Sequence, residues 1–198
     1  MAKKTSQDAA KTRAEIMVQA KTLFAEQGYA GTSAREISAA AGVTVGAMFH
    51  HFDSKLDLFQ QVFEALELEM DSQAKAASKP ELGLDVLETF LSGVRISLDF
   101  AERPDFHRIV FIEAPAVFGE NKWREVDARL GLKTVMAGAR ALMAGGLLAE
   151  QPVKPIAILL MGAMNAAGFA LARGEDAVDK DALINALRLL IIRTRRQR

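Results

Sequence analysis

The chain has 198 residues, about half of them apolar, which suits one large domain or a small domain joined to a larger one. Because it has no cysteine, disulfides, zinc–thiolate sites, iron–sulfur clusters and cysteine nucleophiles are excluded. Its 25 acidic and 25 basic residues leave a formal net charge of zero, which gives no overall case for nucleic acid.

Two helices are predicted at the start of the chain. Apolar residues at helical spacing predict a helix over residues 11–27, and Gly28 follows, where a glycine commonly ends a helix. Ser33 and Glu36 have the spacing of a capping box, in which hydroxyl and carboxylate each satisfy a free backbone N–H. The capping box opens a short second helix over residues 33–41. The side chains expected to face inward are Ile37, Ala40 and Ala41.

Residues 43–52 alternate apolar and other side chains, as a half-buried strand does. A single strand would leave its hydrogen-bonding groups without partners, and no other segment of the chain alternates convincingly. Thr44 suits the N-cap of a helix, and apolar residues recur at helical spacing after it. We therefore predict a third helix over residues 44–51, which forms a helix-turn-helix with the second helix and the turn at Gly42.

The remaining chain is also predicted to be helical. Ser54 and Asp57 repeat the capping-box spacing and open a long helix that ends near residues 78–80. Pro104 suits the first turn of a helix that Pro115 kinks or ends. The other predicted helices cover residues 82–102, 121–148, 155–172 and 180–194. The expected fold class is all-α with about nine helices: an N-terminal three-helix helix-turn-helix domain over residues 1–55 and a larger helical domain over residues 56–198.

The helix predicted over residues 155–172 carries no charge and approaches the length of a membrane-spanning helix. Asn165 near its middle, its many small residues and the lack of flanking Trp or Tyr favour a buried helix of a soluble protein. Residues 1–13 lack the apolar stretch of a secretory signal. We therefore expect a cytoplasmic protein with no membrane partner.

The predicted third helix has a surface that suits DNA, because a helix-turn-helix places its second helix in the major groove. Hydroxyl and small side chains there can reach base edges or meet thymine methyl groups, and other side chains can reach phosphates. A structural helical hairpin is the alternative, since the helix lacks Arg, Asn and Gln, the strongest base readers. The base-facing candidates are Thr44, Val45, Gly46 and Ala47, and the phosphate-facing ones are His50, His51 and Lys55.

Residues 13–63 resemble the N-terminal domain of TetR-family transcriptional regulators. The matching features are "A..LF...GY..TS" at 20–33, "I...AGV..G" at 37–46 and "HHF.SK..L" at 50–58. Phe49 departs from the family, which usually has a tyrosine there whose hydroxyl binds a phosphate, so Phe49 is left with packing alone. The resemblance implies DNA contacts by Thr44, Val45, Gly46, Phe49, His51 and Lys55, assisted by the segment that holds Thr32, Ser33 and Arg35.

The resemblance also implies a homodimer that binds a palindromic operator in double-stranded DNA and is released by a small-molecule effector. Residues 56–198 would then form the ligand-binding and dimerisation domain. Small residues at three- and four-residue spacing independently predict that helix 155–172 pairs with helix 180–194 and their symmetry mates in a four-helix bundle. The alternative is a core helix within one chain. The expected interface residues are Gly162, Ala163, Ala166, Ala167, Ala170, Leu183, Leu187 and Leu190.

Aromatic and methionine side chains of the larger domain predict an apolar ligand pocket with a polar group to orient its occupant. Each of these residues, taken singly, is equally at home in an ordinary core. The apolar candidates are Phe106, Phe111, Trp123, Met161 and Met164, and the polar candidates are His107, Glu113 and Asn165.

No catalytic residue, metal site or cofactor is predicted. His50 and His51 are neighbours on a helix, so their side chains point about 100° apart and cannot share a metal. The chain has no HExxH, GxSxG, P-loop or dinucleotide-binding glycine pattern. We therefore predict a sequence-specific DNA-binding repressor rather than an enzyme. The alternative is a non-catalytic helical structural or ligand-binding oligomer without operator binding.

Overall fold

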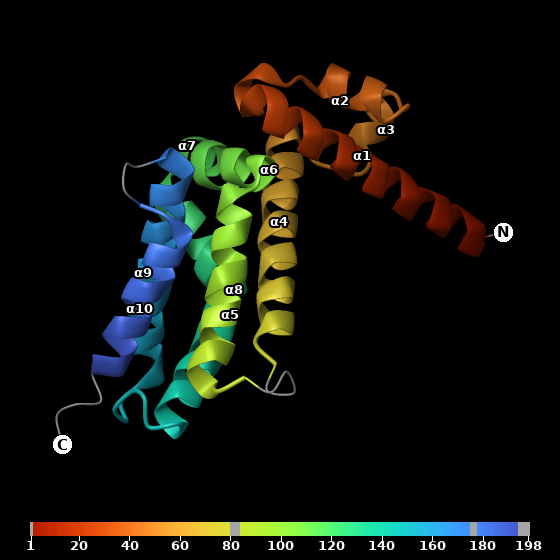
Figure 1. The fold of residues 1–198 in the computed structure, drawn as a ribbon. Helices are drawn as coiled ribbons and strands as arrows, with labels where there is room; N and C mark the ends of the chain where they lie inside the picture. The colour runs from red at the N-terminus through yellow and green to blue at the C-terminus, as the bar shows by residue number, and fades with distance from the viewer. Residues whose placement is uncertain (1, 80–83, 175–177, 194–198) are drawn as a thin grey trace. The chain divides into compact units, whose positions relative to one another are not determined.

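Helices make up all the regular structure in the computed structural model, which describes residues 2–79, 84–174 and 178–193 (Figure 1). If the continuous run from α6 to α7 counts as one, the described residues form nine helices, which confirms the predicted fold class. The helices are α1 (Ala2–Gly31), α2 (Ala34–Ala40), α3 (Val45–Phe49), α4 (Lys55–Ala77), α5 (Val86–Glu102), α6 (Pro104–Phe106), the π-helix η2 (His107–Glu113), α7 (Ala114–Phe118), α8 (Glu120–Ala144), α9 (Val153–Arg173) and α10 (Lys180–Arg193).

The chain forms two compact units, and each is described by itself. The first unit combines Met1–Leu66 with Pro104–Glu120, and the second combines Glu67–Arg103 with Asn121–Arg198. The first unit therefore holds α1, α2, α3, the beginning of α4 and the whole run from α6 to α7. The predicted division at residues 55 and 56 separates a DNA-binding domain from a ligand-binding and dimerisation domain. Because it assigns functions to parts of the chain, it stays a prediction.

A break at Gly28 divides α1, where φ is 75° and ψ is 172°. Glycine adopts such a positive φ without strain, so the regular helix ends where the sequence predicts, although helical turns resume as far as Gly31. The helix begins at Ala2, earlier than the predicted residue 11. Ile16, Ala20 and Phe24 on its inner face are fully buried and anchor α1 in the first unit.

Side-chain caps begin α2 and α3. The Ser33 hydroxyl accepts a hydrogen bond from the Glu36 N–H (3.2 Å), and the Glu36 carboxylate accepts one from the Ser33 N–H (2.8 Å), which confirms the capping box. The Thr44 hydroxyl accepts from the N–H of Ala47 (3.1 Å). Residues 45–49 are therefore helical, as predicted, despite their alternating sequence.

The inward face of α2 differs from the prediction in one place. Ile37 is buried as expected, but Ala40 is exposed and Ser38 is buried instead. Ser38 can occupy this apolar site because its hydroxyl donates to the carbonyl of Ala34 (2.7 Å) within the same helix.

The capping box predicted at the start of α4 forms only in part. The Ser54 hydroxyl accepts from the N–H of Asp57 (3.0 Å), as predicted. The Asp57 carboxylate, however, accepts from the N–H of Asp53 (3.0 Å) rather than from that of Ser54.

Pro115 neither ends nor interrupts the run from Pro104 to Phe118. Proline has no N–H to donate to the preceding turn, and its ring needs room there. The structure accommodates it after the wider π-helix η2, where the N–H of Ala114 donates to the carbonyl of Ile109. The prediction missed this because π-helical turns have no simple sequence pattern.

In the second unit, α5 packs against α9 and α10 over an apolar core (Figure 1). Gly138 of α8 lies beside the ring of Phe90, where a Cβ would come within 2.7 Å of the ring, so this glycine allows close packing. The predicted start at residue 82 and the predicted end at residue 194 lie outside the described residues. So do residues 175–177, which lie between the helices predicted over residues 155–172 and 180–194.

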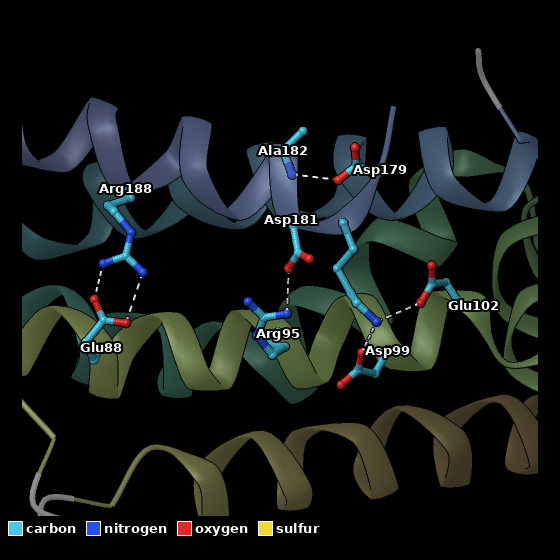
Figure 2. A network of polar contacts seen from close by, with 9 residues as sticks. Glu88, Arg95, Asp99, Glu102, Asp179, Asp181, Ala182 and Arg188 are labelled. Atoms are coloured by element: carbon cyan, nitrogen blue, oxygen red, sulfur yellow. Dashed lines mark hydrogen bonds and ion pairs between the residues drawn. The ribbon is translucent and has the colours of Figure 1, made fainter. Parts of the chain in front are cut away.

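Ion pairs join α10 to α5 along their length (Figure 2). Arg188 donates to both oxygens of Glu88, and these hydrogen bonds lower the pKa of the Glu88 carboxyl. Nearer the start of α10, Arg95 pairs with Asp181 at 2.8 Å, and Lys180 pairs with Asp99 and, at 2.9 Å, with Glu102.

The α9 helix is long and apolar enough to cross a membrane by length and composition alone. Core helices of soluble proteins meet the same criterion, so this finding is weak evidence for a membrane span.

Candidate nucleic-acid interface

The outer surface of α3 carries the residues predicted to read DNA. Met48 points inward and is fully buried, and its sulfur accepts a hydrogen bond from the Ser38 hydroxyl of α2 (3.5 Å). The burial of Met48 determines which side of α3 faces out. On that side, Thr44, Gly46, Phe49 and His50 are exposed, and Val45, Ala47 and His51 are partly buried.

Gly46 has open space around it. A Cβ at this position would meet only the Thr44 hydroxyl oxygen, at 3.9 Å. Its φ lies outside the left-handed region, so neither packing nor backbone strain within the chain requires glycine here. A glycine without such a structural reason, in the middle of an exposed helix, is consistent with close approach of a partner.

Three residues that lie before α2 or within it are predicted to assist DNA binding, and their surroundings differ. Arg35 and Ser33 are exposed, although the Ser33 hydroxyl is already engaged as the N-cap. Thr32 is only 1 % exposed, and its hydroxyl donates to the carbonyls of Gly28 (2.8 Å) and Leu23 (3.2 Å). The side chain of Thr32 therefore holds the end of α1 in place, and contact with DNA would require it to leave the interior.

Lys55 also has structural partners. Its ammonium donates to the carbonyls of Tyr29 and Thr32, both at 2.9 Å, and lies 4.1 Å from the centre of the Tyr29 ring. An ammonium has three N–H groups, so these two hydrogen bonds leave one for a phosphate. Tyr29 was not among the predicted residues, although it stands beside Gly28 in the matching "GY" of the sequence.

The residues predicted to bind a ligand fall into separate groups, one in each unit. In the first unit, the rings of Phe106 and Phe111 lie 5.8 Å apart, edge to face, and His107 is partly buried. Glu113 of the same segment accepts a hydrogen bond from the N–H of Tyr29 (3.0 Å) and pairs with Arg108 (2.9 Å). Its carboxylate is therefore occupied by partners within the first unit.

In the second unit, Trp123 is 2 % exposed and its ring lies 5.2 Å from that of Phe169. The amide of Asn165 donates to the carboxylate of Asp127 (2.6 Å). Met161 is buried and Met164 is partly buried, and both belong to or pack against the apolar core. These four predicted ligand residues thus line the interior of this unit together with a buried acid that the prediction did not include.

Three buried carboxylates in the second unit were missed: Glu67 and Asp71 of α4 and Asp127 of α8. Burial raises the pKa of Glu67 well above its ordinary range, and the negative charges of Asp127 and Asp71 raise it further. Burial also raises the pKa of Asp127 from 3.8 to about 6, against the opposing effect of the hydrogen bond from Asn165. Their signal in the sequence was Glu67 itself, which follows Leu66 and lies four residues after Phe63 on the apolar face of α4.

These three acids have few compensating contacts. Asp71 pairs with Lys75 at 2.5 Å and accepts a hydrogen bond from the Thr134 hydroxyl. Among the residues that the structure describes, no group of three or more His, Cys, Asp or Glu side chains could hold a metal ion.

Apolar side chains are exposed on both α9 and α10. The α9 residues Ile158 and Leu159 are 51 % and 69 % exposed, and Leu190 of α10 is 68 % exposed. Of the predicted interface residues, Gly162, Ala163 and Ala166 are also exposed, whereas Ala167, Ala170, Leu183 and Leu187 are partly buried. Apolar side chains this exposed on two helices are typical of a surface that another protein covers.

Two parts of the chain match known protein families. Residues 16–62 match the family of bacterial regulatory proteins named tetR, and residues 87–193 match the tetracyclin repressor-like C-terminal domain. The chain belongs to the TetR family. Its second match covers more than half of the chain, so the assignment includes the helices beyond the helix-turn-helix and confirms the resemblance seen in the sequence.

Relatives and solved structures agree with this assignment. The chain is 41 % identical over 128 residues to the HTH-type transcriptional regulator AcrR of Shigella flexneri, covering 59 % of this chain and 58 % of that protein. It is 42 % identical over 60 residues to the HTH-type transcriptional repressor BepR of Brucella suis, covering 30 % and 29 %. A crystal structure of a TetR-family regulator from Pectobacterium atrosepticum, 32 % identical, superposes with a TM-score of 0.76 over 93 % of this chain and 94 % of that one. The matches thus span less than two thirds of the length of these curated relatives.

Phe49 stands where the TetR-family resemblance implies a tyrosine. Its side chain is 43 % exposed on the outer surface of α3, so it is available to a partner rather than used in the core. A phenyl ring without a hydroxyl cannot donate to a phosphate, but it can pack on a sugar or a base methyl group.

Proposed function

We propose that this TetR-family chain is a transcriptional repressor that binds a palindromic operator as a homodimer in the cytoplasm. The observation that carries the proposal is the outer surface of α3, where Thr44, Gly46 and Phe49 are exposed while Met48 fixes the helix from behind. Exposed small and hydroxyl side chains on the second helix of a helix-turn-helix suit the major groove. His50, His51 and Arg35 flank this surface and can supply phosphate contacts.

The second copy would lie on the apolar surface of α9 and α10. Two copies that bury Leu159 and Leu190 against each other would form a two-fold four-helix bundle, as the small residues of α9 predict. Such a dimer presents two copies of α3, and it would read half-sites about one helical turn of DNA apart, or a multiple of this.

A small-molecule effector would bind in the second unit, near Trp123, Met161, Met164 and Asn165. Binding would favour a dimer in which the two α3 helices no longer match the half-site spacing. A coupling free energy of about 1–3 kcal/mol would weaken operator binding roughly 5- to 150-fold. Ligand contacts by Phe106, His107 and Phe111 in the first unit stay a prediction.

A selection of genomic DNA fragments by the purified protein tests the proposal, with Gly46→Glu as the matched variant. The wild type should retain a palindromic sequence, with an affinity that falls steeply as salt rises. Gly46→Glu should retain none, because the added carboxylate meets the phosphates and crowds the groove. Since a Cβ at residue 46 has open space, this variant should keep the helical circular dichroism of the wild type.

Sedimentation tests the dimer, with Leu159→Glu as the variant. A charge at this exposed apolar site should leave the fold intact and shift the protein to monomers. If the wild type is oligomeric but retains no specific DNA, the alternative of a helical structural or ligand-binding oligomer holds instead. If Gly46→Glu binds the same operator as the wild type, α3 is not the reading helix.

A further inference from the structure

The break in α1 leaves one backbone N–H without a helical partner, and a distant side chain takes it. Because Gly28 has φ 75°, the N–H of Tyr29 turns away from the helix and donates to Oε2 of Glu113 in η2 (3.0 Å). The other oxygen, Oε1, accepts from Nη2 of Arg108 at 2.9 Å. The two oxygens of one carboxylate thus hold two different groups, and one of them, the N–H of Tyr29, lies 84 residues before Glu113 in the chain.

Gly28 is needed for this contact as much as for the turn. A Cβ on Gly28 would lie 2.4 Å from Oε1 of Glu113 and 2.8 Å from Nη2 of Arg108. Real atoms do not approach so closely, so a Cβ at residue 28 would require the ends of the Glu113 and Arg108 side chains to shift. The positive φ and the missing side chain of Gly28 therefore serve the same contact with η2.

From Tyr29 the contacts continue to the helices that position α2 and α3. The Tyr29 carbonyl accepts a hydrogen bond from Lys55 at the start of α4, and Lys55 also binds the carbonyl of Thr32, just before the N-cap of α2. The Tyr29 ring lies 5.0 Å from that of Phe59 in α4. Tyr29 therefore joins η2, α4 and the beginning of α2 at one point of the first unit.

We propose that Glu113 is a positioning residue whose carboxylate couples the segment Pro104–Glu120 to the DNA-reading helices through the backbone amide of Tyr29. Along the chain, the segment follows α5, which lies in the second unit, and leads into α8, which continues into that unit. A change in those helices would thus reach α2 through this carboxylate. The inference rests on the proposed operator binding, and it names the contact through which that binding is regulated.

Operator DNA itself is the probe, because coupling between two sites is reciprocal. Hydrogen exchange of the wild-type protein is measured with and without the DNA duplex recovered in the selection. We expect the duplex to slow amide exchange within residues 104–118 as well as in α2 and α3. In Glu113→Met, which keeps the volume but loses the acceptor, the Tyr29 amide of the free protein should exchange about 10- to 100-fold faster.

The coupling is read from the response of residues 104–118 to DNA in three variants. Glu113→Met should bind the duplex, since α3 is unchanged, but lose the response. Glu113→Gln retains an acceptor oxygen for Tyr29 but presents an NH2 group to Arg108 in place of Oε1, so it should weaken the response without abolishing it. Asp105→Asn is the matched control, because Asp105 pairs with Lys21 of α1 (3.3 Å) and not with the turn at Tyr29, and it should keep the full response.

Several outcomes would overturn the inference. If Glu113→Met binds the duplex and keeps the full response, the carboxylate is an ordinary structural contact. If the wild type binds the duplex but amide exchange in residues 104–118 does not change, the segment is not coupled to DNA binding. If the wild type retains no duplex, the proposed function itself fails, which is a separate result. If Glu113→Met does not fold, Arg108→Met should weaken the response by freeing Oε1, and an unchanged response would count against the inference.

Discussion

Replacing Asp127 by asparagine should stabilise the protein above neutral pH. Burial raises the pKa of this carboxyl from 3.8 to about 6 in the folded state, so at pH 8 the folded protein carries a charge that the unfolded chain carries more easily. One pKa unit corresponds to about 1.4 kcal/mol, and the rise from 3.8 to about 6 therefore costs the folded state about 3 kcal/mol. Asparagine removes the charge and keeps a carbonyl oxygen for the hydrogen bond from Asn165.

The sign follows from proton binding. Between pH 3.8 and about 6 the folded state holds more protons on Asp127 than the unfolded state, so this group makes stability fall as the pH rises through that window. At pH 5, about one unit below the folded pKa, the wild type should have recovered roughly half of the cost. Glu67, whose pKa is raised for the same reason, contributes in the same direction.

Thermal unfolding at pH 5 and pH 8, at one protein concentration, measures the effect. A chain of this length shifts its Tm by about 2–4 °C per kcal/mol, so Asp127→Asn should raise the Tm at pH 8 by up to roughly 10 °C and at pH 5 by about half as much. Glu125→Gln, which removes an exposed carboxylate from the same helix, should follow the wild type at both pH values. Equal pH dependence in the wild type and Asp127→Asn would refute the assignment of a strained buried charge.

Two further substitutions test polar contacts in the two units. Lys55→Met removes the hydrogen bonds to the carbonyls of Tyr29 and Thr32, and urea unfolding should show a loss of about 2 kcal/mol together with weaker operator binding; unchanged stability would mean that solvent replaces both bonds equally well. Arg188→Met breaks the pair with Glu88, which is more than one third exposed, so the loss should be only about 0.5–1 kcal/mol and should shrink in 1 M salt. A larger loss that salt does not reduce would show that packing of the arginine side chain, and not its charge, is what matters.

The sequence predicted the helices well where local chemistry decides them. Ser33, Thr44 and Ser54 each accept an N–H at the start of their helix, and these interactions involve residues three positions apart. Local spacing was therefore sufficient to reject a strand over residues 43–52. It was insufficient for η2, because the π-helical turn depends on how Pro115 and its neighbours fit the rest of the first unit.

The candidate site was predicted less completely, for a reason that Thr32 and Asp127 illustrate. Thr32 belongs to a motif that touches DNA in the TetR family, yet its own hydroxyl is buried against the end of α1. Asp127 was overlooked because a single acid on a helix usually faces water, and only the packing of α8 shows that it is buried. Both features depend on tertiary burial, which no spacing within one helix records, and DNA contact by Thr32 stays a prediction.

The contacts of Tyr29 and Lys55 explain why this motif is difficult to divide into DNA-binding and structural residues. Two N–H groups of Lys55 hold the carbonyls of Tyr29 and Thr32, which leaves the third for a phosphate. The same ammonium would therefore position α2 and contact DNA at once. A change that moves Tyr29 would then alter both the placement of the reading helices and the charge presented to the phosphates. Regulation through Glu113 would need only a small displacement at this point, because the amide that it holds and the carbonyl that Lys55 holds belong to the same residue.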